Sequence, residues 1–302
     1  MRRAQANALL LVAAFIWGTA FVAQQTGMRD VGPFIFTGTR FLFGAVIIAP
    51  LAWWELRRLA QAGVRLDRRD LAAGGLLGAV LFLGAALQQI GVAGTSVSNA
   101  GFLTALYVPL VPIASALILR ERLHWAVWPA SLGCLAGTWL LGGGALSALS
   151  AGDVWVTASA AFWAAHVMLV GRVAARKGAP IIVAMLQFLV CGLLGLAVGG
   201  TGEVISAEGL ARALPSIAYA GVLSVGLGFT LQVVAQRHTQ AADAAILLSC
   251  ETIFAALAGR VVLGESLSTQ QMMGGALIFA CVMAVQLLPL LRARAAGTVP
   301  AC

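Results

Sequence analysis

Long runs of apolar residues fill this 302-residue chain, and short polar or Gly/Pro-containing breaks separate them. A helix that crosses a bilayer needs about 20 mostly apolar residues. The runs between the breaks predict ten such helices. These helices are expected at residues 7–26, 34–54, 71–90, 96–119, 125–141, 154–170, 180–198, 214–236, 241–263 and 269–288. The pattern therefore predicts an all-α polytopic membrane protein.

The composition agrees with this prediction. Hydrophobic residues make up 61% of the chain and charged residues 10%, whereas a soluble domain has about 45–50% and about 25%. A water-soluble globule, a disordered chain and a soluble catalytic domain are therefore excluded. The five cysteines lack the paired spacing that is typical of a metal site or a disulfide framework.

The basic residues indicate the orientation of the chain. A net charge of +8 would suggest a nucleic-acid partner for a soluble protein. Here most of the 19 basic residues fall into alternate loops, beginning with Arg2 and Arg3 and ending with Arg292 and Arg294. By the positive-inside rule, both termini are expected in the cytoplasm. The protein is predicted to lie in the bacterial inner (plasma) membrane, with the lipid bilayer and not a nucleic acid as its partner.

The chain also contains an internal repeat. A glycine-rich connecting loop at residues 143–152 separates a first five-helix repeat, residues 1–142, from a second one with a short cytoplasmic tail, residues 153–302. The informative matches are Gln88 with Gln232, Thr95 with Thr239, Glu121 with Glu265, Trp17 with Trp163, and Pro33 with Pro180. Five crossings per repeat leave the second repeat inverted. Inverted repeats are characteristic of secondary transporters, whose substrate sites lie near the membrane midplane.

Four stretches resemble the EamA family of the drug/metabolite transporter superfamily, and the likeness covers nearly the whole chain. They are residues 16–22, Pro33 with Arg40 and Phe41, residues 107–109, and residues 251–267. The resemblance implies ten helices, export of amino acids or similar metabolites, and a cavity lined by helices 1–4 and 6–9. Helices 5 and 10 would be peripheral. One departure matters: Thr252 follows Glu251 where such proteins often carry proline, so the resemblance does not predict a proline kink there.

Glu251 is the foremost candidate for a functional residue. It lies ten residues into its predicted helix, so it is about 15 Å deep in a core of about 30 Å. An ionised side chain at that depth costs about 3 kcal/mol and usually faces a cavity or a partner. We expect Glu251 to couple transport to protons or to bind an amine. The alternative is a carboxyl that only joins helices. Tyr107 occupies the equivalent position of the first repeat.

Four other residues within the predicted spans could bind substrate. The guanidinium of Arg40 suits a two-pronged interaction with a carboxylate, although a structural ion pair or hydrogen bonds to helix ends would also explain it. Trp17 and Trp163 match across the repeats, and their rings suit either a flat substrate or core packing. His166 can titrate near physiological pH or serve as an interhelical hydrogen-bonding group.

Uncharged polar residues complete the candidate site. Gln88, Gln232 and Asn99 lie within apolar spans, where such groups orient a substrate or join helices. Pro109 and Pro112 remove backbone donors from helix 4 and should bend it.

The absence of two sequence motifs narrows the range of possible function classes. The only lysine, Lys177, is not part of a Walker A loop, and no zinc-binding His-Glu-x-x-His pattern occurs. We therefore expect no cofactor, no metal and no enzymatic activity. The predicted function is a monomeric secondary transporter that exports small metabolites, above all amino acids including aromatic ones, by alternating access with protons as a coupling ion. A passive facilitator of the same solutes and a polytopic lipid-modifying enzyme stay open as alternatives.

Overall fold

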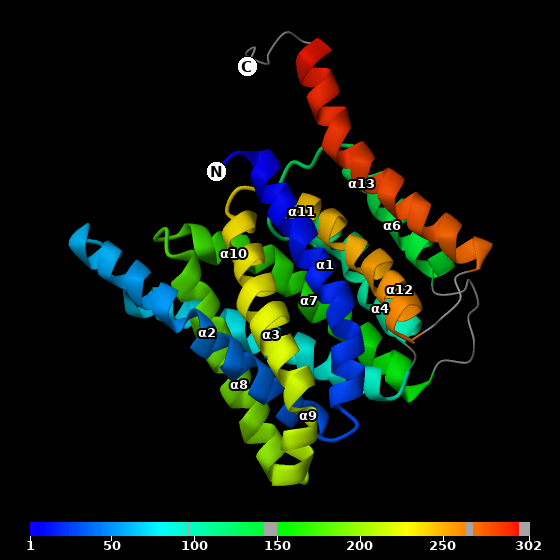
Figure 1. The fold of residues 1–302 in the computed structure, drawn as a ribbon. Coiled ribbons are helices and arrows are strands. Elements are labelled where there is room, and N and C mark those ends of the chain that lie inside the picture. Colours follow the sequence, from blue (N-terminus) through cyan, green and yellow to red (C-terminus); the bar gives the residue numbers. More distant parts are fainter. Residues whose placement is uncertain (96, 142–149, 264–267, 296–302) are drawn as a thin grey trace.

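The computed structural model describes the backbone of residues 1–95, 97–141, 150–263 and 268–295. Side chains of residues 97–99, 141, 263, 286–287 and 289–295 also lie outside the described part. All regular elements in these ranges are helical (Figure 1). They are α1 (Arg3–Gly27), α2 (Pro33–Gln61), α3 (Arg68–Ala93), α4 (Val97–Thr104), α5 (Tyr107–Leu117), α6 (Val127–Leu141), α7 (Ala151–Ala175), α8 (Pro180–Gly202), α9 (Ala207–Tyr219), η1 (Ala220–Phe229), α10 (Thr230–Gln236), α11 (Ala241–Leu248), α12 (Cys250–Leu263) and α13 (Thr269–Ala295).

These elements confirm the predicted polytopic fold. Eight helical stretches of the described chain are long and apolar enough to cross a membrane. Three of them are composite, because α4 continues into α5, α9 continues through η1 into α10, and α11 continues into α12. The 15-residue helix α6 and the apolar part of α13, Thr269–Val285, correspond to the remaining two of the ten predicted helices. The connecting loop predicted at residues 143–152 falls mostly outside the described residues.

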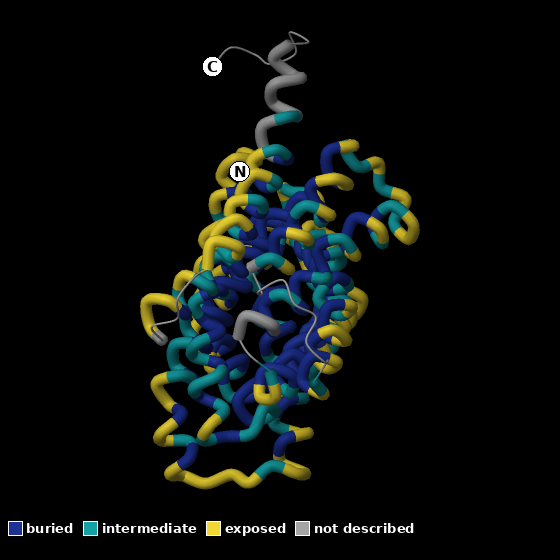
Figure 2. The backbone as a smooth tube through the Cα atoms, turned by 90° about the vertical axis from the view of Figure 1, so that its right-hand side faces the viewer, coloured by how far each residue is buried: buried dark blue, intermediate teal, exposed yellow. Residues whose placement is uncertain are grey.

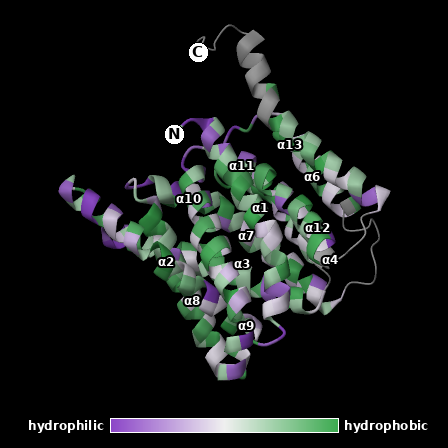
Figure 3. Cartoon of the chain, in the orientation of Figure 1, coloured by the Kyte–Doolittle hydropathy of each residue, from purple (hydrophilic) through white to green (hydrophobic). Residues whose placement is uncertain are grey.

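The outward surface of the bundle suits lipid. Large apolar side chains are exposed along several helices, with Val46 67%, Leu117 75% and Val261 82% exposed. Hydrophobic residues cover much of the helical ribbon in Figure 3. The buried residues run through the middle of the bundle, as the dark tube in Figure 2 shows. Contiguous exposed apolar surface of this kind needs a nonpolar solvent.

The two halves are related by an inverted repeat, as the sequence predicts. The second helix of each half, α2 and α8, pack against each other, as do the fifth helices, α6 and α13. Gly38 of α2 lies against Leu196 of α8, while Ile35 lies against Gly199. Residue numbers therefore rise along α2 as they fall along α8, so these equivalent helices run antiparallel. In Figure 1 the N-terminus and the end of α13 lie at the same end of the bundle.

The fourth and ninth predicted helices are interrupted at equivalent places by different means. Helix 4 of the prediction corresponds to α4 and α5, and helix 9 corresponds to α11 and α12. Pro109 has no N–H for the Ala105 carbonyl, and the Val108 N–H takes that carbonyl instead, at 2.9 Å. The helix consequently breaks between α4 and α5, just before Pro109, whereas Pro112 lies inside the continuous helix α5. In the second half the break is at Ser249, between α11 and α12. There the Thr252 hydroxyl donates to the Ser249 carbonyl at 2.8 Å, so helix 9 is interrupted without a proline.

The antiparallel pair α2 and α8 is closed by two reciprocal caps. Both helices begin with proline, and the backbone N–H groups that follow have no partner within their own helix. Glu203, at the end of α8, accepts hydrogen bonds from the N–H groups of Phe34 and Ile35 at 2.9 and 2.7 Å. Glu55, near the end of α2, accepts from the N–H of Ile182 at 2.9 Å. Each helix thus caps the start of the other.

Candidate functional site

A cavity of about 50 Å³ lies between the two halves of the bundle. This volume holds a few water molecules. Its lining comes from α1, α2, α3, α4, α5, α7, η1, α10, α11 and α12, with no described lining residue from α6, α8 or α13. The family resemblance implies a lining from helices 1–4 and 6–9, and among these the seventh helix, α8, contributes no described lining residue. The lining residues are Trp17, Phe21, Gln24, Arg40, Gln88, Thr104, Tyr107, Trp163, Val167, Ser224, Phe229, Gln232, Leu248 and Glu251.

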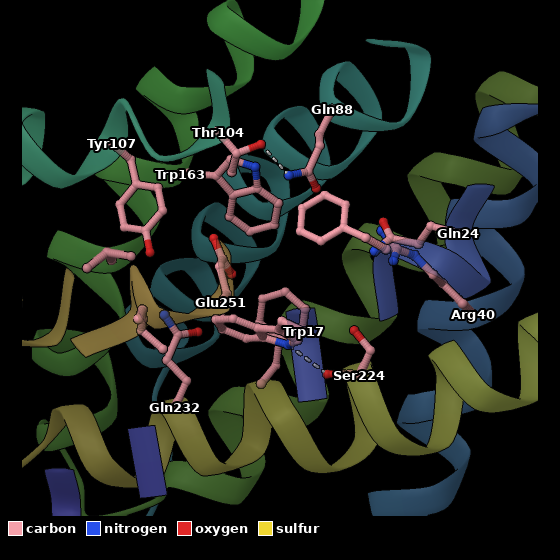
Figure 4. A pocket seen from close by; sticks show the side chains of 14 residues that line it. Trp17, Gln24, Arg40, Gln88, Thr104, Tyr107, Trp163, Ser224, Gln232 and Glu251 are labelled. Carbon is pink, nitrogen blue, oxygen red and sulfur yellow. Dashed lines mark hydrogen bonds between the residues drawn. The ribbon is translucent and has the colours of Figure 1, made fainter. Parts of the chain in front are cut away.

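Most of the residues singled out in the sequence meet in this cavity. Seven of the nine line it, and Figure 4 shows their side chains around the shared space. They are Trp17, Arg40, Gln88, Tyr107, Trp163, Gln232 and Glu251. His166 does not line the cavity, and the side chain of Asn99 lies outside the described residues.

Glu251 lines the cavity next to the break between α11 and α12. It is the second residue of α12, directly after the interruption at Ser249, and only 6% of it is exposed. Gly18 of α1 lies against the Glu251 backbone so closely that a Cβ there would come within 2.5 Å of the carbonyl oxygen. The carboxyl group makes no ion pair within the described part of the chain. A buried carboxyl in this setting is available to a proton or to a ligand.

Arg40 lines the same cavity from α2. It is 3% exposed, and its guanidinium lies over the rings of Phe36 and Phe41, 5.6 and 5.1 Å from their centroids. Its Nε has no hydrogen-bond partner, and no described carboxylate lies within ion-pair distance of it. The structural ion pair considered for Arg40 is therefore not found among the described residues. A buried cation held only by aromatic faces favours an anionic ligand.

Aromatic rings form one wall of the cavity. The Trp17 Nε1–H donates to the Ser224 carbonyl at 3.1 Å. Phe229 lies between the two tryptophans, with its ring centroid 4.6 Å from that of Trp17 and 6.0 Å from that of Trp163, to which it is stacked. Phe229 is a lining residue that the sequence pattern does not single out, because its partner in the repeat alignment, Ala85, is small.

The amide side chains leave polar capacity unused. Gln88 donates to the Thr104 hydroxyl at 2.9 Å. The Oε1 atoms of Gln24 and Gln232 and the Nε1 of Trp163 are buried without a hydrogen-bond partner. Native structures seldom leave buried polar groups unpaired unless a water, an ion or a ligand serves them. These donors and acceptors give the cavity a polar lining that can hydrogen-bond to water or to a ligand.

His166 has a different environment. It is fully buried, and its Nε2 lies 2.9 Å from the Gln187 Oε1 on α8. The Trp163 ring stands edge-on to it, with centroids 6.1 Å apart. The structure thus shows the interhelical hydrogen bond that the sequence offers as one explanation for His166.

Matching hydrogen bonds occur at the two ends of the bundle. Thr95 donates to the Asp153 carboxylate at 2.6 Å, at the end away from the N-terminus. Thr239 donates to the Asn7 amide oxygen at 3.3 Å, at the N-terminal end. Thr95 and Thr239 match in the repeat, and Asn7 and Asp153 are separated by the same offset as Trp17 and Trp163. We name these two contacts the end latches.

A lipid-suited bundle with inverted halves and a polar cavity between them is the architecture of a membrane transporter. The EamA-like transporter family matches residues 5–143 and 150–286. The chain belongs to this family.

Relatives agree with this assignment. An uncharacterized transporter of Archaeoglobus fulgidus is 28% identical over 290 residues, which cover 95% of this chain and 87% of that protein. Protein PagO of Salmonella typhimurium is 23% identical over 296 residues, 90% of each chain. A solved crystal structure with 20% sequence identity superposes with a TM-score of 0.77 and covers 97% of this chain and 99% of the other. That likeness shows the shared fold.

Proposed function

We propose that the protein exports small zwitterionic metabolites, above all amino acids with apolar or aromatic side chains, across the bacterial inner membrane. The observation that carries this proposal is that Arg40 and Glu251 line one cavity and that neither has an ion-pair partner within the described chain. A zwitterion supplies both missing charges. Its carboxylate binds the guanidinium, and its ammonium group binds the carboxylate of Glu251.

The aromatic wall and the amides define the rest of the ligand. Trp17, Phe229 and Trp163 present ring faces to the cavity, which suit an apolar or aromatic side chain. The unpaired amide oxygens of Gln24 and Gln232 accept hydrogen bonds from the ammonium group. A cavity of about 50 Å³ is smaller than an amino acid, so the substrate enters a state in which the halves have moved apart.

Protons couple to transport through Glu251. Its carboxyl group holds either a proton or the substrate's ammonium group, because burial disfavours an unpaired negative charge. Exchange of one for the other links export to the proton gradient. The end latches support alternating access, since one contact closes each end of the bundle and the two correspond under the repeat.

The test is transport by the purified protein in lipid vesicles, with and without a proton gradient. A matched panel separates the charges: phenylalanine, phenethylamine without the carboxylate, and 3-phenylpropionate without the amine. We expect transport of phenylalanine well above that of both analogues, and stimulation by the gradient.

Nucleosides serve as a neutral comparison in the same vesicles. Transport of nucleosides without transport of any amino acid would refute the proposed substrate class. Transport of amino acids that ignores the gradient would identify a passive facilitator.

A further inference from the structure

A second cavity, of about 480 Å³, opens at the end of the bundle that holds the N-terminus. We name it the vestibule. Its walls come from the start of α1, the segment before α6 and the first residue of α6, the segment between α10 and α11, the first turn of α11, and α13. Because the basic loops are expected on this side of the membrane, the vestibule is predicted to face the cytoplasm.

The vestibule has a positive lining. Arg3, Arg122, His124 and His238 face it, and Asp243 is the single carboxylate among its described lining residues. Arg122 makes no ion pair with any residue whose side chain is described. Desolvation, first, and then the positive charges of the N-terminal amine and Arg237 lower the pKa of His238, so the positive charge of the lining comes from Arg3 and Arg122. The electrostatic potential at this mouth therefore attracts anions.

Asp243 forms an ion pair with one of these cations, Arg3. The Arg3 guanidinium donates to the Asp243 Oδ2 at 2.5 Å and so joins α1 to the first turn of α11. The Arg3 side chain is 50% exposed, while that of Asp243 is 7% exposed. A solvent-borne anion can therefore approach Arg3 without displacing anything except the Asp243 carboxylate.

The ion pair lies directly above the barrier to the central cavity. Asp243 lines the vestibule, and Leu248 of the same helix lines the central cavity. These residues are about 8 Å apart along the helix. Between the cavities, Leu10 of α1 belongs to the same buried cluster as Ile246 and Leu247 of α11. Separation of α1 from α11 would open this barrier.

We propose that the vestibule is the cytoplasmic binding site for the substrate's carboxylate. In the closed state, the Asp243 carboxylate occupies the position on Arg3 at which the substrate's carboxylate binds. The inference rests on the proposed function and adds a first recognition step to it. An arriving carboxylate forms a two-pronged contact with Arg3 and releases Asp243. The anion then stabilises the state in which α1 and α11 are apart, because only that state offers it the free guanidinium.

The test measures opening directly and not transport. Hydrogen–deuterium exchange of residues 241–248 is followed in the unmodified chain, in nanodiscs of phosphatidylcholine. The probes are propionate and its neutral isostere propionamide, with sodium chloride as the ionic-strength control. We expect propionate to speed exchange of this segment several-fold, and propionamide and chloride to leave it unchanged. Equal effects of propionate and propionamide would overturn the proposal.

Three variants sharpen the result. Asp243→Asn should exchange fast without any probe, and Arg3→Gln should lose the response to propionate. The double exchange Arg3→Asp with Asp243→Arg restores the ion pair and should restore slow exchange. If residues 241–248 of Asp243→Asn exchange as slowly as those of the parent, the Arg3–Asp243 ion pair does not hold α1 and α11 together and the proposal fails.

Two further outcomes separate this inference from its alternatives. If phosphatidylglycerol in the nanodisc speeds exchange and propionate does not, the vestibule binds a lipid headgroup phosphate and the proposed carboxylate is wrong. If the propionate response is present but no amino acid is transported in vesicles, the proposed function fails while the anion site stands.

Discussion

The two halves of the bundle share two aromatic pairs at equivalent places but differ in the charges near them. Trp17 matches Trp163, and Phe41 matches Phe188, which lies 6.1 Å from it between ring centroids. Arg40 of the first half, however, matches Gln187 of the second at the offset that relates Pro33 to Pro180.

At the interrupted helices the ionisable acid lies in the second half, whereas the first half has an uncharged residue. Tyr107 follows the break in helix 4, and Glu251 follows the break in helix 9. The first half thus supplies the cation of the cavity and the second half supplies the carboxyl. In the proposed function, the similar halves allow the bundle to adopt two related conformations, and the unlike residues set the orientation in which a zwitterion binds.

The largest expected effect comes from the carboxyl. Glu251→Gln removes the group that, in the proposed function, exchanges a proton for the substrate's amine, and we expect gradient-driven export to fall about 30-fold or more, the equivalent of about 2 kcal/mol. Tyr107→Phe, at the equivalent place, should change the rate by no more than about threefold. Vesicle transport at several gradients checks both. A proton-coupled Glu251→Gln protein would contradict the assigned role.

Arg40→Gln gives both halves the same residue at this position. Loss of a charge-assisted contact of about 1.5–3 kcal/mol should raise the KM for phenylalanine about tenfold or more, and should leave transport of phenethylamine little changed. Transport kinetics with both solutes provide the measurement. An equal loss for the two would show that Arg40 does not bind the carboxylate.

The end latches differ in charge, since Asp153 accepts from Thr95 where Asn7 accepts from Thr239. Asp153→Asn makes the two alike and weakens one by about 1 kcal/mol, so the population open at that end should rise about fivefold. Labelling of Ala100→Cys by an impermeant maleimide from outside reports this opening. Asn7→Asp is the matched variant and should not raise it. A labelling rate unchanged by Asp153→Asn would argue against a latch.

The smallest effect is expected where the halves are alike. Glu55→Gln and Glu203→Gln each weaken one reciprocal cap by about 1 kcal/mol, so the melting temperature in detergent should fall by about 2–4 °C for each. Glu208→Gln is the control, because its side chain is 89% exposed and surface ion pairs contribute little. Unequal losses for the two caps would show that the pair is not symmetric in energy.

Much of the fold could be predicted from the sequence because lipid imposes a simple rule on it. Runs of about 20 apolar residues cannot hide elsewhere, so the helices were expected close to where they lie. Polar residues within spans are costly and face a shared cavity. That argument brought together Glu251, Arg40 and Gln88, which are far apart in the sequence.

Local backbone features were harder to predict. The break at Ser249 depends on hydroxyl groups that hydrogen-bond to nearby carbonyls, and serine and threonine make such bonds in unbroken helices as well. The caps by Glu55 and Glu203 depend on the antiparallel arrangement of α2 and α8, which no local pattern reveals. His166 carries the same imidazole wherever it faces, so its contact with Gln187 had to come from the structure.

The π-helix η1 has a consequence for chain length. Each π turn takes about one residue more than an α turn, so the ten residues of Ala220–Phe229 wind through less rotation than an α-helix of equal length. Phe229, at the end of this stretch, and Gln232, just after it, line the cavity with that phase. Deleting or inserting a single residue in this stretch would leave both ends of the helix in lipid but rotate a different set of side chains toward the substrate.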